Sequence, residues 1–158
     1  HFSHKAAIAI TNASGDDLTD LVDRSLLFTH GQEYLYIHEL VRQFAARKLG
    51  QTPALQVTAQ QQHCEYYLSL LTDWWENSEN QRVVSILLPE LDNIYPAYDW
   101  AFNQQNFVLF HGAILSFMRF HIYAGLNWDG HQQVSTYHEK FIKLVERKPD
   151  CIHPQRLQ

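Results

Sequence analysis

Apolar residues in the first part of the chain recur at a helical spacing, with short polar breaks between the runs. Alanine and isoleucine repeat in this way over residues 2–10, which predicts a helix that ends before Gly15. Asp16 or Asp17 can then cap a second helix that extends to about residue 25, because acidic side chains suit the positive end of a helix dipole. The pattern therefore predicts two consecutive helices at the start of the sequence.

The spacing then changes. Residues 26–29 and 34–37 are short apolar runs on either side of Gly31, which predicts a β-hairpin and no other β-structure in the chain. The helical period returns over residues 38–49, and we expect Phe44 to support the packing of this part of the protein. The apolar positions of this third helix share one face: Leu40, Val41, Phe44, Ala45 and Leu49.

Residues 50–53, with the sequence Gly-Gln-Thr-Pro, stop this helix and predict a domain boundary. Only helical signals follow it, and the main runs cover residues 54–75 and 89–103 with a shorter run between them. Pro96 lies inside the second run and predicts a kink or break near Tyr95, because proline removes a backbone hydrogen bond and clashes with the preceding turn.

The last helical runs, residues 107–124 and 129–147, predict an antiparallel helical hairpin. The first of them is long and apolar enough to raise the question of a membrane span. It contains His111 and Arg119, which would be costly in hydrocarbon, so we interpret it as a buried helix of a protein with no membrane association.

Composition supports a chain that packs against a neighbour. Of the 158 residues, 46% are hydrophobic and only 18% are charged, which leaves uncharged surface for a partner. The cysteines, Cys64 and Cys151, are too few for a disulfide framework and indicate reduced thiols in the cytoplasm.

Charge argues against a nucleic-acid surface, because phosphate binding needs a basic face. The formal net charge is −5. Residues 1–52 contribute −1 (5 Lys and Arg against 6 Asp and Glu) and residues 53–158 contribute −4 (7 against 11). Neither part is basic.

The sequence Ile37-His38-Glu39, followed by Leu40-Val41-Arg42, resembles the "MHD" element of STAND-class signalling ATPases. This class includes plant disease-resistance proteins, apoptotic protease-activating factors and bacterial regulators. Four further segments are similar to motifs of the same class and lie in the same order: residues 18–27 ("L-x-x-L-V-x-x-S-L-L"), 63–68 ("R-H-x-x-Y-Y-L"), 90–101 ("E-x-x-N-I-x-x-A-x-x-W-A") and 125–130 ("G-x-(W/Y)-x-E-G").

The resemblance implies a fold that is mainly α. Residues 1–52 would form a winged-helix domain with one β-hairpin, and residues 53–158 an α-helical linker and the start of a TPR-like region. It also implies that His38 contacts the β-phosphate of ADP held by an adjacent ATPase domain. Glu39 stands where the family usually has Asp, which leaves the role of this carboxylate open.

In this interpretation the chain is a regulatory module without catalytic residues. It couples the ADP or ATP state of the neighbouring ATPase domain to a protein or small-molecule signal sensed by further helical repeats. The sequence has no G-x-x-x-x-G-K-[ST] loop, so we expect no cofactor to bind this chain alone and no ATP hydrolysis. Its ten histidines show no tight metal-ligand spacing, and we expect neither a metal site nor a catalytic dyad.

Two alternatives remain open at this level. The first is a DNA-binding winged-helix transcriptional regulator that reads DNA through the helix around Leu18, where Arg24 is the only basic residue among Asp17, Asp20 and Asp23. The second is a helical-repeat scaffold that binds a protein and has no nucleotide role.

Overall fold

The computed structural model describes residues 1–77, 80–125, 132, 135–136, 139–140 and 143. Within them the chain is mainly helical with one small antiparallel sheet, which confirms the expected fold class. Most of the helix expected over residues 129–147 lies outside the described residues.

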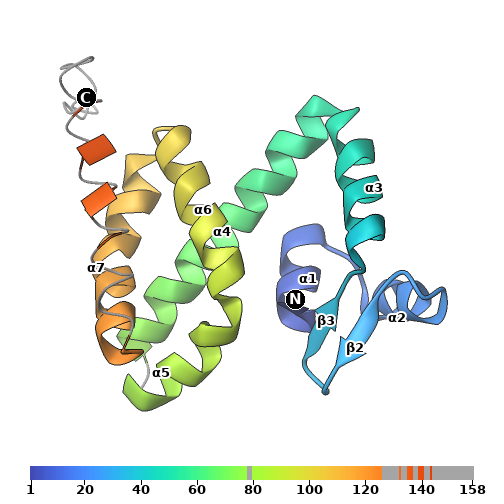
Figure 1. Ribbon diagram of the computed structural model, residues 1–158, viewed down its shortest axis with the longest axis horizontal. Coiled ribbons are helices and arrows are strands. Elements are labelled where there is room, and N and C mark those ends of the chain that lie inside the picture. The colour runs from blue at the N-terminus through green and yellow to red at the C-terminus, as the bar shows by residue number, and fades with distance from the viewer. Residues whose placement is uncertain (78–79, 126–131, 133–134, 137–138, 141–142, 144–158) are drawn as a thin grey trace.

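The N-terminal part contains a three-stranded sheet and three helices (Figure 1). The strands lie in the order β1-β3-β2, and the pair of helices α1 and α2 precedes the β2–β3 hairpin, as in a winged helix. Gly31 in the hairpin turn has a φ of 65°, which glycine adopts without strain. The elements are β1 (Phe2–Ser3), α1 (His4–Thr11), α2 (Gly15–Asp23), β2 (Phe28–His30), β3 (Tyr34–Tyr36) and α3 (Glu39–Gly50).

Strand β1 corrects the prediction that the hairpin holds the only β-structure. Phe2 pairs with Leu35 and Ser3 with Tyr34, so the N-terminal residues form an edge of the sheet. The Ser3 side chain accepts the Ala6 N–H and caps α1, which therefore begins at His4. The residues before this cap are free to be extended, whereas the sequence pattern had placed them inside the helix.

The second helix begins at Gly15 with Ser14 as its N-cap, which corrects the prediction that Asp16 or Asp17 is the capping residue. Ser14 and Asp17 form a reciprocal capping box, in which each side chain accepts the backbone N–H of the other residue. The Ser14 hydroxyl, and next the Ser14 backbone N–H, donate to the Asp17 carboxylate and lower its pKa. Asp17 thus belongs to the cap of α2, with Ser14 as the N-cap residue.

The rest of the described chain is helical, and none of its described residues after Tyr36 is in a strand. Helix α6 runs unbroken through Pro96, so of the predicted kink or break near Tyr95 the break is wrong and the kink stays a prediction. Pro96 is exposed, while Ile94, Ala97 and Tyr98 on the opposite face are buried and hold the helix together. The elements are α4 (Pro53–Asn77), α5 (Asn80–Leu87), the 3-10 helix η1 (Leu88–Glu90), α6 (Leu91–Asn103) and α7 (Phe107–Tyr123).

Helix α4 runs between the two halves of the molecule, with α1 on one side and α6 and α7 on the other (Figure 1). The larger core joins α4, α6 and α7, and Ala6 of α1 belongs to it. A smaller core lies inside the N-terminal part, and its fully or largely buried members are Ala7, Leu18, Leu27 and Leu35. Helix α1 therefore contributes neighbouring residues to both cores.

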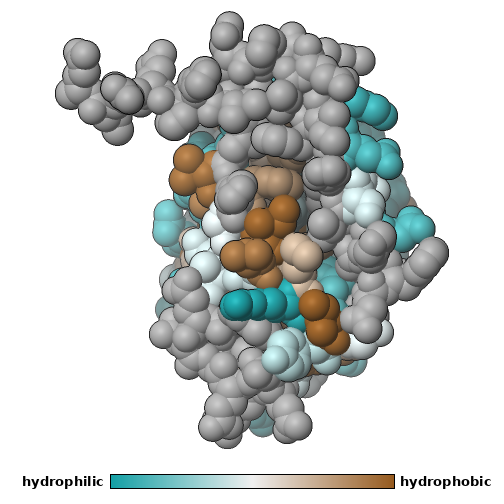
Figure 2. Space-filling view, turned by 90° about the vertical axis from the view of Figure 1, so that its left-hand side faces the viewer, coloured by the Kyte–Doolittle hydropathy of each residue, from teal (hydrophilic) through white to brown (hydrophobic). Residues whose placement is uncertain are grey.

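Apolar side chains also gather on the outer face that carries α7 (Figure 2). On this helix Val108, Leu115 and Ile122 are exposed and recur every seven positions. Despite this apolar surface, none of the helices described is both long and apolar enough to cross a membrane.

Candidate functional site

His38 lies at the junction between β3 and α3, as the sequence predicts, and its backbone is extended. It is the N-cap residue of α3: its Nδ1 accepts the Leu40 N–H at 3.2 Å. A neutral imidazole that accepts at Nδ1 carries its proton on Nε2. Because the side chain is exposed, this Nε2–H can donate to a group outside the described chain.

The charge beside His38 is arranged by Glu39 in the first turn of α3. The Glu39 carboxylate accepts three hydrogen bonds of 2.7 Å, two from the Arg42 guanidinium and one from the Gln43 amide. These bonds, with that from Arg42 the stronger cause, lower the pKa of Glu39 to about 2. The carboxylate is thus paired with a guanidinium, and the positive end of the helix dipole still favours an anion beside His38.

Helix α3 buries none of its residues. Leu40 is 70% exposed and Phe44 is 60% exposed, which corrects the expectation that Phe44 supports the packing of the N-terminal part. The Lys48 ammonium lies 5.8 Å from the centre of the Phe44 ring. The exposed surface formed by Leu40, Phe44 and Lys48, with His38 at its head, is called the α3 face below.

The alternative recognition helix, α2, presents acidic groups to solvent. Asp16, Asp17, Asp20 and Asp23 are all exposed. Arg24, which follows the helix, forms an ion pair of 2.9 Å with Asp20. This helix therefore offers a negative surface where a groove-reading helix would need a positive one.

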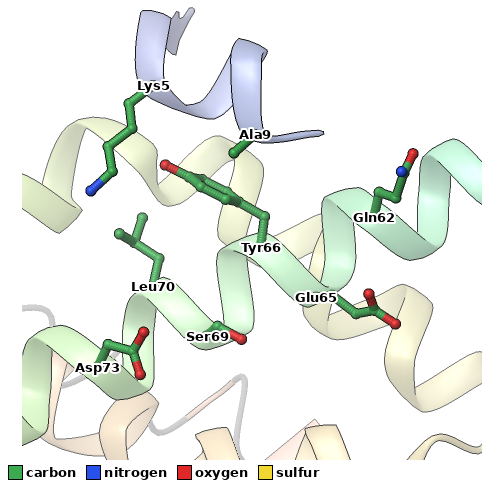
Figure 3. Close-up of a pocket in the computed structure, with 8 residues that line it drawn as sticks. All are labelled: Lys5, Ala9, Gln62, Glu65, Tyr66, Ser69, Leu70 and Asp73. Carbon is green, nitrogen blue, oxygen red and sulfur yellow. The ribbon is translucent and has the colours of Figure 1, made fainter. Parts of the chain in front are cut away.

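A groove of about 510 Å³ lies along the contact between α1 and α4 (Figure 3). Tyr66 and Leu70 of α4 line its middle, and Lys5 of α1 extends over it. The carboxylates of Glu65 and Asp73 lie on the α4 side. The groove is open to solvent and mixes both signs of charge.

Neither metal nor thiol chemistry has support within the described residues. No group of three or more His, Cys, Asp and Glu side chains is close enough there to hold a metal ion. Cys64 is fully buried, and its thiol donates to the Ala97 carbonyl at 3.3 Å. Burial, and next the nearby Glu65 carboxylate, raise the pKa of this thiol to about 11, which makes it a poor nucleophile at neutral pH.

Comparisons with known proteins give distant relatives only. No family model matches the chain, and no solved structure matches it. A protein from Mycobacterium tuberculosis and one from Mycobacterium bovis, each named "Putative HTH-type transcriptional regulator", are 31% identical to it over 125 residues. The match covers 72% of this chain and 14% of each relative, so the chain spans only a small part of the length of these relatives.

Proposed function

We propose that this chain is a regulatory segment of a large transcriptional regulator, in which His38 donates a hydrogen bond to the β-phosphate of ADP bound by an adjacent ATPase domain. The observation that carries the proposal is the geometry of His38. Its Nδ1 is used by the helix cap, and the opposite ring nitrogen is left with a proton that points away from the cap. The imidazole is therefore fixed in the tautomer that can donate to a phosphate.

The exposed α3 face supports a docked neighbour at the same place. Isolated helices of about 12 residues are only marginally stable in water, so a helix that buries no side chain gains most from a partner. Leu40 and Phe44 would lose their contact with water in such an interface. A domain that covers α3 would bring its bound nucleotide to the N-terminus of the helix, where His38 lies.

This arrangement makes the chain one half of a switch. With ADP bound, the contact at His38 favours the closed form. A signal sensed by helical repeats would favour the open form by binding it more tightly. The charge-assisted hydrogen bond from His38 is worth roughly 1.5–3 kcal/mol, which is part of what such a switch needs.

DNA binding by α2 is the second candidate function. It is favoured by the name of the mycobacterial relatives and by the order of α1, α2 and the β2–β3 hairpin. The four exposed aspartates of α2 argue against it. We therefore place the DNA-binding part of the regulator elsewhere in the parent protein.

The test uses two substitutions of His38 in the parent protein. His38→Asn keeps a good helix cap but is too short to reach the phosphate, whereas His38→Ala removes both functions. We expect ADP to leave both variants roughly ten- to a hundredfold faster than the wild type, in line with one lost bond to a charged group. Only His38→Ala should also lower the free energy of unfolding, by about 0.5–2 kcal/mol.

Two results would overturn this proposal. The first is an ADP release rate in His38→Asn equal to that of the wild type. The second is binding of this chain to duplex DNA that weakens with salt and is lost in Arg24→Ala, which would assign the function to α2 instead.

A further inference from the structure

A buried carboxylate joins the helical part of the molecule to the sheet. Glu90, at the start of α6, is only 3% exposed. Its Oε2 accepts a hydrogen bond of 3.1 Å from the Tyr67 hydroxyl and one of 2.9 Å from the Asn93 amide. None of the ion pairs between described residues involves it. We call Glu90, Tyr67 and Asn93 the Glu90 cluster.

The cluster extends to the first strand through Asn93. The same amide nitrogen that bonds to Glu90 also donates to the His1 carbonyl at 3.0 Å. His1 precedes β1, and β1 pairs along β3, with Phe2 opposite Leu35 and Ser3 opposite Tyr34. Strand β3 ends at Tyr36, two residues before His38. A continuous chain of hydrogen bonds and backbone therefore links α6 to His38.

Tyrosine side chains show that the sheet and the cluster are close enough to influence one another. The pKa of Tyr34, on β3, is raised by burial and next by the negative charge of Glu90. The pKa of Tyr66, on α4, is raised mainly by burial and also by the negative charge of Glu90. The start of the short strand β1 is thus held by the helical part, through the bond from Asn93 to His1.

Burying a carboxylate without a cation costs free energy, and apolar residues at the same place would often be as stable or more so. The Glu90 carboxylate instead orients a neighbour, because its hydrogen bond holds the Asn93 amide in the orientation that reaches the His1 carbonyl. We propose that Glu90 and Asn93 of this cluster position His38: their hydrogen bonds hold β1, and through β1 they hold β3, against the helical part. This inference rests on the proposed function for the role of His38, but not for the coupling itself.

The test compares Asn93→Ala with Tyr67→Phe in the whole chain. Asn93→Ala cuts the link to His1, whereas Tyr67→Phe removes a bond of the same carboxylate and leaves that link intact. We expect Asn93→Ala to speed amide hydrogen exchange in β1 and β3 roughly tenfold, as for the loss of one hydrogen bond, and to shift the NMR signals of the His38 imidazole. Tyr67→Phe should leave both unchanged, even where it lowers the melting temperature.

If Asn93→Ala folds poorly, Asn93→Ser is the second variant, since its short side chain cannot span both acceptors. Equal β3 exchange rates and His38 signals in the Asn93 and Tyr67 variants would overturn the inference. In the parent protein, faster ADP release is expected from Asn93→Ala but not from Tyr67→Phe. Should His38→Asn leave ADP release unchanged while Asn93→Ala still loosens β3, the proposed function fails and the coupling stands.

Discussion

At the scale of single residues, His38 and Glu39 at the junction between β3 and α3 have different roles, although the sequence shows them as parts of one motif. His38 closes the helix end with one ring nitrogen, and its side chain is otherwise exposed. Glu39 does not compete for that helix end, because Arg42 and Gln43 hold its carboxylate. The extra methylene of Glu relative to the Asp of the resembled family gives the carboxylate reach along the helix.

The cause of the low Glu39 pKa can be tested by titration. Glu39 has a pKa of about 2 in the folded chain, below the ordinary Glu pKa of 4.5. Its contacts therefore stabilise the fold fully above pH 4.5, and this stabilisation is lost as the pH falls through about 2. We expect carbon-13 NMR to show that Arg42→Ala raises this midpoint toward 4.5, and that Gln43→Ala raises it less. Arg47→Ala, on the same helix, is the control and should leave it in place. A midpoint that Arg42→Ala does not move would rule out the bidentate pair as the cause.

At the scale of elements, α3 differs from every other helix of the N-terminal part. Helices α1 and α2 each bury at least one side chain in the small core, whereas α3 buries none. Its apolar positions have the spacing of a core helix, yet Leu40 and Phe44 face solvent. Such a surface is typical of an interaction site rather than of a core.

Substitutions of Phe44 and Leu35 should therefore differ in their effect on the free energy of unfolding. Phe44→Ala should change the free energy of unfolding of this chain by less than about 1 kcal/mol, because the ring is already 60% exposed. Leu35→Ala should cost about 2–5 kcal/mol, because Leu35 is fully buried in the small core. Urea unfolding measures both. A loss of several kcal/mol in Phe44→Ala would mean that α3 packs inside the chain after all.

The same helix shows what periodicity can and cannot reveal. The pattern over residues 38–49 predicts the helix found at Glu39–Gly50, because the 3.6-residue period is a local property. It cannot tell whether the apolar face is covered by this chain or by another. Strand β1 escapes prediction because Phe2–Ser3 is too short to show alternation, and its pairing with β3 is a long-range contact. The motif pointed to His38, but not to the cap that fixes its tautomer, nor to the link through Asn93.

At the scale of the whole molecule, α1 is shared by the two cores. Ala6 is fully buried against the helical part, while Ala7 packs in the small core with Leu18 and Leu35. Consecutive helical residues point in different directions, so a single helix can hold both sides. The hydrogen bond from Asn93 to His1 adds a polar link beside it. A movement of the helical part would therefore also displace the sheet and His38.

Because the two cores share α1, the decisive measurement is whether the sheet and the helical part lose stability together. Ala6→Leu overfills the contact between α1 and α4 and should cost about 1–3 kcal/mol. Because α1 belongs to both cores, we expect the amides of Leu35 in β3 and Phe117 in α7 to lose hydrogen-exchange protection by the same amount. Ala9→Leu, at an exposed position on the same helix beside the groove, is the control and should leave both amides protected. If Ala6→Leu weakened protection at Phe117 alone, the sheet would be independent of the helical part, and no signal could pass from there to His38 through the fold.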